Sequence, residues 1–421
     1  MAISESLLEV TLTDITHGGE AVGRYEGKVV FVPYALPGER VRVRVAEARK
    51  RYIRAELVEV LEPSPQRVTP PCRHFGECGG CQWQHIAYEA QLTYKRQILR
   101  SQMTHLAALP EVSVAPVLGM DRPWNYRNHA QFSLDEEGGL GYLAARSHRV
   151  VPIEECFLLH PFLEDILAAL SLELPTLTRL TLRAGVNTGD LMVIFETEED
   201  EIPELEVDFP ASFVWLSSAG IPVTLIGRDY IQEEVAGQRF RLSANSFFQV
   251  NTEQTEHLIR LVAEELAPTG DETLLDMYCG VGTFGLALAD RVRAVIGMEE
   301  NPWAIQDARV NAEGCSNATF LQGRVEDILP GLERVVQLAV LDPPRTGIAP
   351  EALQALIKLA PQRVAYVSCD PASLARDLKT LAEAGYAVRN VWPVDMFPQT
   401  YHVECVVRLE RKYPQHTSLP E

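Results

Sequence analysis

Residues 274–282 read LLDMYCGVG, an apolar run that reaches an acidic residue and then enters a glycine-rich turn. Glycine at positions 280 and 282 lets the backbone approach a ligand closely, and amides at the start of the next helix can contact its polar groups. A buried strand, an acidic residue at its end and a glycine turn into a helix are typical of nucleotide-binding α/β proteins. The turn alone does not choose the ligand, because nicotinamide-binding proteins share it.

Apolar runs of strand length alternate with helical stretches through residues 237–413. This alternation predicts a doubly wound, largely parallel sheet with helices on both faces. Ligands of such sheets bind at the carboxyl ends of the strands, so residues that follow a strand are the first candidates for a site. The expected segments are 273–277, 286–289, 294–298, 304–313, 335–341, 351–359 and 364–367.

The N-terminal region, residues 1–62, reads as short strands separated by glycine turns at 17–19 and 36–38. This spacing predicts a small OB-like β-barrel, a fold that often binds oligonucleotides. A proline-rich linker at 63–71 leads to a central α+β region, residues 72–236, which begins with a cysteine cluster. The expected strands of the barrel are 8–12, 28–32, 40–45 and 53–60.

The chain has 421 residues and a net charge of -20. No apolar run reaches the roughly 18 residues of a membrane span, and residues 1–5 lack the features of a signal peptide. We therefore expect a cytoplasmic monomer without a membrane partner, with reduced cysteines. The acidic balance argues against a nucleic-acid partner, but residues 40–54 hold seven Lys or Arg and one acid, and phosphate binding depends on the local patch. The polar tail, residues 414–421, is expected to fray.

Three further side chains follow later strands of the predicted sheet. Glu299 lies at the end of the strand after the glycine turn, where a carboxylate can accept both hydroxyls of a ribose. Asp342 opens an Asp-Pro-Pro sequence, and Cys369 follows the apolar run 364–367. A cysteine at the end of a buried strand is where an α/β enzyme would hold a nucleophile, although a lone cysteine can also simply pack in the core.

Five motifs together resemble the RNA 5-methyluridine methyltransferase family. Asp-Pro-Pro by itself resembles the substrate edge of S-adenosylmethionine methyltransferases that act on planar nitrogen or ring substrates. Residues 1–62 resemble a TRAM domain, an RNA-binding barrel attached to many members of the family. The resemblance covers nearly the whole chain and implies a multidomain α/β protein with a C-terminal Rossmann-like class I methyltransferase domain. The motifs are FFQVN at 247–251, LDMYCGVG at 275–282, DPPRTG at 342–347, VSCDPASLARD at 367–377 and TYHVE at 400–404.

The resemblance implies S-adenosylmethionine as the methyl donor and a uridine in RNA as the substrate. Met277 stands where leucine is usual in the family, and Thr283 where some members have asparagine. Gln249 and Asp342 could contact either the donor or the uracil edge, which presents an acceptor, a donor and an acceptor. The cofactor-binding residues implied by the resemblance are Gln249, Tyr278, Gly280, Gly282, Thr283, Glu299 and Asp342.

The resemblance also implies that Cys369 is the nucleophile and Glu404 the base. Carbon 5 of uracil is too weak a nucleophile to take a methyl group unaided, and a thiolate that adds to carbon 6 converts the ring to an enolate. The turn after Cys369 leads into a helix N-terminus, which is expected to lower the pKa of the thiol. His402 is expected to be structural and is the second candidate for the base. Three other cysteines are expected to be structural: Cys279, Cys315 and Cys405.

Four cysteines have the spacing of a metal centre. Zinc and a [4Fe-4S] cluster both accept four thiolates, and spacing alone does not choose between them. The sequence CGGCQWQH at 78–85 resembles the iron–sulfur motif found in part of the family, so the resemblance implies a [4Fe-4S] cluster. No step of methyl transfer needs an electron, so we expect a structural or RNA-positioning role. The expected ligands are Cys72, Cys78, Cys81 and Cys156.

The segment Tyr126-Arg127-Asn128 resembles a substrate-contact segment of the family, and an aromatic ring, a cation and an amide can stack on and bond to an unpaired base. Arg345 could reach a phosphate, with a surface salt bridge as the alternative. The TRAM-like barrel and the cysteine cluster favour 23S rRNA as the partner, while tRNA T-loop enzymes share most of the motifs. An RNA cytosine-5-methyltransferase and a non-catalytic RNA-binding iron–sulfur protein are the competing functions.

Overall fold

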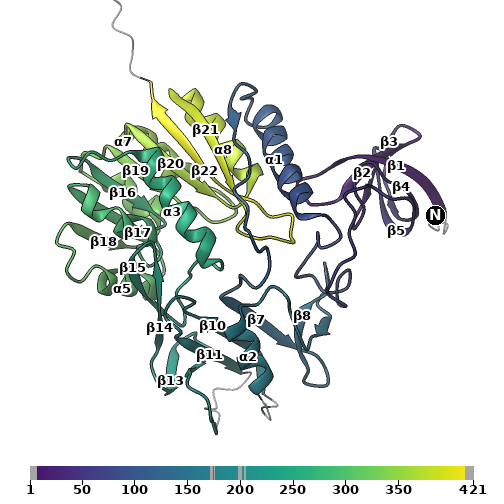
Figure 1. The fold of residues 1–421 in the computed structure, drawn as a ribbon. Coiled ribbons are helices and arrows are strands. Elements are labelled where there is room, and N and C mark those ends of the chain that lie inside the picture. Colours follow the sequence, from purple (N-terminus) through teal and green to yellow (C-terminus); the bar gives the residue numbers. More distant parts are fainter. Residues whose placement is uncertain (1–6, 171–173, 175, 198–201, 203–204, 413–421) are drawn as a thin grey trace, which may run out of the picture.

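The computed structural model describes residues 7–170, 174, 176–197, 202 and 205–412. The chain forms a small N-terminal barrel, a central sheet and a larger C-terminal sheet, with the barrel at one side of the molecule (Figure 1). The predicted tail, residues 414–421, lies outside the described residues. Among the helices of the described part of the chain, none is long and apolar enough to cross a membrane.

The N-terminal strands close into a barrel in the order β1-β2-β3-β5-β4. Side chains alternate along these strands, so Val10, Val30 and Val41 meet in one apolar core. Four of the five strands were predicted from the sequence. The strand that was not predicted, β2, is short and contains Gly23, a residue unfavourable in strands. The strands are β1 (Leu7–Ile15), β2 (Ala21–Tyr25), β3 (Lys28–Val32), β4 (Arg40–Ala48) and β5 (Tyr52–Glu62).

The central region builds a seven-stranded sheet in the order β13-β12-β11-β10-β7-β8-β9. Helix α2 (Pro161–Ala169) packs on it through a core that contains Phe132, Leu163 and Leu180. A separate hairpin of β14 and β15 leads into the C-terminal region. The strands are β7 (His129–Leu134), β8 (Leu140–Leu143), β9 (Val150–Pro152), β10 (Leu177–Ala184), β11 (Leu191–Thr197), β12 (Ser212–Leu216), β13 (Pro222–Ile226), β14 (Tyr230–Val235) and β15 (Gln238–Ser243).

The C-terminal region is an eight-stranded sheet in the order β18-β17-β16-β19-β20-β22-β21-β6. The strands from β18 to β20 are parallel, and β22 runs antiparallel between β20 and β21. This order confirms the predicted doubly wound α/β fold. The strands are β6 (Ser113–Val114), β16 (Thr273–Met277), β17 (Ala294–Glu299), β18 (Ala318–Gln322), β19 (Leu338–Leu341), β20 (Arg363–Ser368), β21 (Tyr386–Val394) and β22 (Glu404–Arg411).

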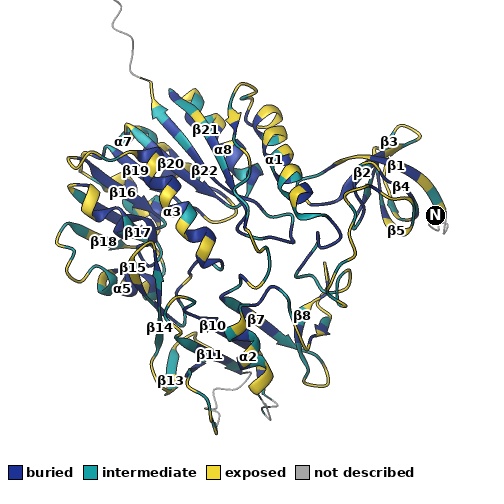
Figure 2. Ribbon diagram, viewed as in Figure 1, coloured by how far each residue is buried: buried dark blue, intermediate teal, exposed yellow. Residues whose placement is uncertain are grey.

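Helices cover both faces of this sheet, because its strands are apolar on both sides. Leu274 and Val406 face the core under α3 and α5, whereas the next residues, Leu275 and Val407, face the core under α1, α7 and α8. Figure 2 shows the resulting band of buried strands. The helices are α1 (Tyr88–His105), α3 (Thr252–Leu266), α4 (Thr283–Ala287), η1 (Ala289–Arg291), α5 (Pro302–Asn311), α6 (Val325–Ile328), η2 (Leu329–Gly331), α7 (Pro350–Leu359) and α8 (Pro371–Glu383).

Candidate active site

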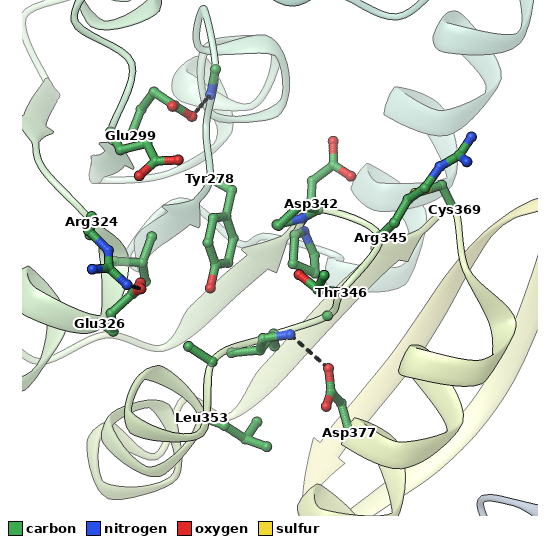
Figure 3. A pocket seen from close by; sticks show the side chains of 18 of the residues that line it. Tyr278, Glu299, Arg324, Glu326, Asp342, Arg345, Thr346, Leu353, Cys369 and Asp377 are labelled. Carbon is green, nitrogen blue, oxygen red and sulfur yellow. Dashed lines mark hydrogen bonds and ion pairs between the residues drawn. The ribbon is translucent and has the colours of Figure 1, made fainter. Parts of the chain in front are cut away.

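A cleft of about 1410 Å³ opens at the carboxyl ends of the parallel strands. Strand β22 is antiparallel, so its first residue lies at the same edge. Figure 3 shows Glu299 at one end of the cleft, Asp342 and Cys369 at the other end, and Tyr278 between them. The residues predicted from the sequence that line the cleft are Gln249, Tyr278, Gly280, Glu299, Asp342, Arg345, Cys369 and Glu404.

The glycine turn and Glu299 form one end of this cleft. One carboxylate oxygen of Glu299 accepts a hydrogen bond from the N–H of Gly280 at 3.1 Å, and the other accepts from the N–H of Asn301 at 2.8 Å. Each oxygen keeps a second lone pair for a hydroxyl donor. Gly280 has a φ of 53°, in the left-handed region that favours glycine. These groups fit the ribose of a nucleotide-type cofactor such as S-adenosylmethionine.

Asp276 supports the turn from behind. It is fully buried, and its Oδ2 accepts the N–H of Gly285 at 2.7 Å. Burial and neighbouring carboxylates raise the pKa of Asp276 to about 7. Two of the predicted cofactor residues, Gly282 and Thr283, lie at the start of α4 and are absent from the cleft lining among the described residues. Gly282 and Thr283 therefore support the glycine turn from the start of α4 and do not line the cleft among the described residues.

Gln249 and Asp342 meet on the cleft wall. The amide Nε2 of Gln249 donates to Oδ2 of Asp342 at 3.4 Å. Asn128 fixes this arrangement, because its side-chain amide donates to the carbonyl of Gln249 and to the hydroxyl of Thr252, both at 3.0 Å. Asn128 is buried, so the amide that the sequence analysis assigns to substrate is engaged within the protein.

Cys369 and Glu404 come from neighbouring antiparallel strands. Ser368, the last residue of β20, pairs with Cys405 on β22, so the residue after Ser368 lies beside the residue before Cys405. Both Cys369 and Glu404 line the cleft. Glu404 is 2% exposed, and its Oε1 has no hydrogen-bond partner among the described residues. The strand register therefore brings the predicted nucleophile and base to one edge.

The electrostatics at Cys369 differ from the sequence expectation. Burial, followed by the carboxylates of Glu404 and Asp342, raises the pKa of the Cys369 thiol to about 12. The expected lowering by the helix N-terminus is wrong, because Asp370 already occupies it. The Oδ1 of Asp370 accepts the first free N–H groups of α8 at 3.1 Å and 2.8 Å, and its negative charge offsets the positive potential of the helix end.

Glu404 is buried and His402 is half-buried, and loss of hydration shifts the pKa of each side chain toward its neutral form. Burial, followed by the charge of Asp342, raises the pKa of Glu404 well above its usual value. Burial also lowers the pKa of His402 to about 3. The His402 ring packs against Tyr401, with ring centroids 4.3 Å apart, and against Phe397. His402 therefore packs in an aromatic cluster as a neutral imidazole.

The barrel contacts the turn that carries Cys369. Nε2 of His17 lies 3.3 Å from Oδ2 of Asp370. The carbonyl of Gly19 accepts the indole N–H of Trp83 at 3.1 Å, and a Cβ at Gly19 would lie 2.7 Å from the ring of Tyr401. Only glycine allows this close approach. The turn between β1 and β2 therefore contacts both the C-terminal region and residues 72–85, which carry Cys72, Cys78 and Cys81 and are called the cysteine segment below.

The four cysteines of the predicted metal centre line one cavity of about 70 Å³: Cys72, Cys78, Cys81 and Cys156. Within the described residues, no group of three or more His, Cys, Asp or Glu side chains is arranged to hold a metal ion. Two other lining groups, Nε of Arg127 and the hydroxyl of Tyr142, are buried without hydrogen-bond partners in that part of the chain. Buried donors without partners are costly, so the cavity suits an anionic group such as a thiolate-bound metal cluster. Arg127, which was predicted from the sequence to contact RNA, lines the wall of the cysteine cavity.

The basic run of the barrel is largely paired. Five of its seven cations form ion pairs with acidic side chains of the same barrel or of the turn beside it: Arg40, Arg42, Arg44, Arg49 and Arg54. Alternate residues of β4 and β5 face each other across the ladder, and Glu56 and Glu59 supply two of the acids. The pairing reduces the positive potential that the sequence run suggests.

A second group of residues, not predicted from the sequence, lines the cleft. Residues 324–326 come shortly after β18, whereas Glu299 is the last residue of β17, and all of them line the same cleft. Figure 3 shows Arg324 and Glu326 near Tyr278. Their position after an apolar strand was the available signal. Phe247, quoted only as part of a motif, is 64% exposed at the cleft mouth.

A Rossmann-like sheet with a nucleotide-type cleft and an attached five-stranded barrel defines a multidomain methyltransferase-type α/β protein. Residues 218–412 match the family model tRNA (Uracil-5-)-methyltransferase, and residues 6–58 match the TRAM domain. An uncharacterised RNA methyltransferase of Halalkalibacterium halodurans is 38% identical, over 96% of this chain and 97% of that protein. One of Thermosynechococcus vestitus is 37% identical over the same shares.

The solved structure of the Pyrococcus abyssi tRNA (uracil-54, C5)-methyltransferase in complex with S-adenosyl-L-homocysteine has a TM-score of 0.76 with this chain. It is 28% identical, over 96% of this chain and 100% of that one. The chain therefore belongs to the RNA (uracil-5-)methyltransferase family. It is an RNA methyltransferase that uses S-adenosylmethionine.

Proposed function

We propose that the protein methylates carbon 5 of a specific uridine in 23S rRNA through a covalent bond between Cys369 and carbon 6 of uracil. The observation that carries the proposal is the strand register, by which Cys369 and Glu404 share one edge of the cofactor cleft. A pyrimidine ring between them would meet a thiol and a carboxyl group. Because both faces of the ring must be reached, the uridine has to leave its stack.

The first chemical step requires the thiolate of Cys369. Bound S-adenosylmethionine would supply the methyl group and a positive sulfonium charge, which favours the ionised forms of Cys369 and the nearby carboxylates. Tyr278, Gly280 and Glu299 would hold it, while Gln249 and Asp342 would hold the donor or the uracil edge. The thiolate adds to carbon 6, the ring becomes an enolate, and carbon 5 takes the methyl group.

The second step requires a base. The carboxylate of Glu404 takes the proton from carbon 5, the electron pair reforms the double bond between carbon 5 and carbon 6, and the thiolate leaves. The raised pKa of Glu404 makes its carboxylate a stronger base than an exposed glutamate. Release of the product therefore depends on Glu404, whereas the attack depends on Cys369.

Product analysis tests this function. Transcripts of 23S rRNA and tRNA are incubated with the protein and S-adenosylmethionine, digested to nucleosides and analysed by mass spectrometry. We expect 5-methyluridine from 23S rRNA only. The tRNA specificity of the Pyrococcus abyssi enzyme makes a T-loop uridine the second candidate, and 5-methyluridine from tRNA alone would support it. 5-Methylcytidine would identify a cytosine enzyme, and no product in either RNA would favour a binding protein.

For the cysteine cavity we infer a [4Fe-4S] cluster. Thiols around a cluster each bind a different iron, so they lie farther apart than the thiols around one zinc ion. The four cysteines that would each bind one iron line one cavity. The buried Nε of Arg127 supports a group of net negative charge. We assign the cluster a structural role.

The proposed cluster predicts the iron and sulfide content of the purified protein. Protein purified without oxygen is expected to be brown and to contain about four iron and four sulfide per chain, with Cys78→Ser losing most of both. Cys315→Ser, at a half-buried cysteine outside the cavity, is the matched control and should keep them. One zinc and no iron in the wild-type preparation would contradict the cluster.

A further prediction concerns RNA binding by the barrel. Lys50 and Arg51 are exposed and, in the part of the chain that the structure describes, form no ion pair. Replacing both with Gln is expected to weaken RNA binding and to reduce the slope of log affinity against log salt by about one to two. Arg40→Gln, at a cation paired with Glu9 and Glu62, should change the slope less. Equal slopes for all three proteins in filter-binding titrations would exclude these cations as phosphate contacts.

A further inference from the structure

Gln399 has an unusual backbone. Its φ is 68°, in the left-handed region that non-glycine residues rarely occupy, and its side chain is only 2% exposed. A buried residue keeps such a conformation only when its surroundings hold it there, and such positions cluster at functional sites. Gln399 lies five residues before Glu404.

The hydrogen bonds of Gln399 come from the cysteine segment and from α1. Its carbonyl accepts the backbone N–H groups of Gln82 and Trp83 at 3.1 Å and 2.9 Å, and these residues directly follow Cys81. Its own N–H donates to Oε1 of Gln91 at 3.0 Å, and its Oε1 accepts from Nε2 of Gln91 at 2.9 Å. Gln91 therefore pairs with both the backbone and the side chain of Gln399.

The residues before Gln399 are held by α1 and by Tyr126 of the loop before β7. Lys95 of α1 forms a fully buried ion pair with Asp395, and its Nζ also donates to the carbonyl of Phe397 at 3.1 Å. The hydroxyl of Tyr126 donates to the carbonyl of Pro398 at 3.1 Å. Segment 395–400 is thus fixed from outside the C-terminal sheet, although it leads into β22.

The turn at Cys369 is held by different contacts. Its neighbours are fixed by bonds among Ser368, Asp370 and Ser373, and by His17 of the barrel. None of the hydrogen bonds described for Gln399 reaches this turn. The hydrogen bonds around Cys369 and those around Gln399 are therefore made by different residues, although the barrel turn at 17–19 contacts both segments through His17 and Gly19.

We propose that Gln399 is a positioning residue for Glu404, through which the cysteine segment and α1 control removal of the carbon 5 proton. The inference rests on the proposed function. Loss of the Gln399 contacts releases the segment before β22 and shifts Glu404, which has no hydrogen bond on Oε1 to hold it. The attack by Cys369 does not depend on these contacts. The network also gives the cysteine segment a role in the reaction that needs no electron transfer.

Two RNA probes separate the two steps. A 23S rRNA transcript made with 5-fluorouridine has no carbon 5 proton at the target, so the adduct forms without the base. A transcript made with [5-³H]uridine releases tritium only when the base removes that proton. A tRNA transcript replaces the rRNA if product analysis identifies tRNA as the substrate.

Gln399→Ala is expected to form the fluorouridine adduct at a rate within about twofold of wild type and to release tritium at least about tenfold more slowly. Gln91→Ala should show the same split, and the double variant should be within about twofold of Gln91→Ala, because both changes remove the bond between Nε2 of Gln91 and Oε1 of Gln399. Gln102→Ala, on the same helix but outside the network, should match wild type in both rates.

Equal slowing of adduct formation and tritium release would overturn the inference, as would unchanged tritium release in Gln399→Ala. Should Gln399→Ala fail to fold by circular dichroism, Gln399→Asn provides the test, because asparagine keeps an amide and tolerates the left-handed region. Slowed tritium release with normal adduct formation in Gln399→Asn supports the inference. Absence of any adduct in the wild type would overturn the covalent mechanism itself.

Discussion

Cys369→Ala is expected to lose methylation by at least about a thousandfold and to form no covalent complex with RNA. Without the thiolate, carbon 6 is not attacked and carbon 5 stays too weak a nucleophile to take the methyl group. Binding of S-adenosylmethionine should survive, because Figure 3 shows Glu299 at the other end of the cleft from Cys369, and Gly280 is hydrogen-bonded to Glu299. Incorporation of labelled methyl groups into RNA and a denaturing gel of the fluorouridine complex measure both effects.

The matched control for this change is Cys315→Ala. Cys315 is half-buried like Cys369, but its thiol contacts Asn317 on the loop before β18, away from the cleft lining. Its removal should leave activity within about twofold of wild type. Retention of more than about a tenth of the wild-type rate in Cys369→Ala would rule out this cysteine as the nucleophile, since deletion of a nucleophile leaves only the contributions of binding and positioning.

The fold and much of the cleft could be predicted because the signals are local. The sequence from Leu274 to Gly282 predicts a strand, a turn and a helix within nine residues, and β16 has the bounds expected from it. In a parallel sheet, residues that follow strands converge at one edge, so Glu299, Asp342 and Cys369 could be placed together without coordinates. The same reasoning could have included residues 324–326 after β18.

Features that depend on contacts across the fold could not be predicted in this way. The raised pKa of Cys369 comes first from burial of the thiol and then from Glu404 across the sheet, while Asp370 caps the helix end that was expected to lower it. The basic run of the barrel loses most of its free charge to acids on neighbouring strands. Gln399 carries no sequence signal. Its left-handed φ and its pairing with Gln91 depend on a segment about three hundred residues away, so local sequence preference does not predict them.

Glu404→Gln is expected to trap the reaction after methyl transfer. The amide has nearly the same shape as the carboxyl group, so Cys369 can still attack and carbon 5 can still be methylated. The amide cannot take the carbon 5 proton, so the thiolate cannot be expelled. A methylated RNA–protein adduct should therefore accumulate on unmodified RNA and persist on a denaturing gel, with multiple turnover slowed by at least about a hundredfold.

Stability provides an independent check that Glu404→Gln acts on chemistry. Burial raises the pKa of Glu404 in the folded protein, so the unfolded chain loses this proton at a lower pH than the folded protein does. The wild type is therefore destabilised as pH rises above the unfolded value of about 4.3, whereas glutamine does not titrate. The melting temperature of the variant should be equal to or higher than that of wild type at neutral pH, and the difference should shrink toward pH 4.

The double variant Cys369→Ala with Glu404→Gln should form no adduct, which links the trapped species to the Cys369 thiolate. His402→Ala separates the two candidate bases, because His402 packs against Tyr401 as a neutral ring with a pKa lowered to about 3 by burial. We expect His402→Ala to turn over without trapping an adduct. Near wild-type turnover in Glu404→Gln together with a trapped adduct in His402→Ala would reverse the assignment, since only the true base converts a transient adduct into a stable one when it is removed.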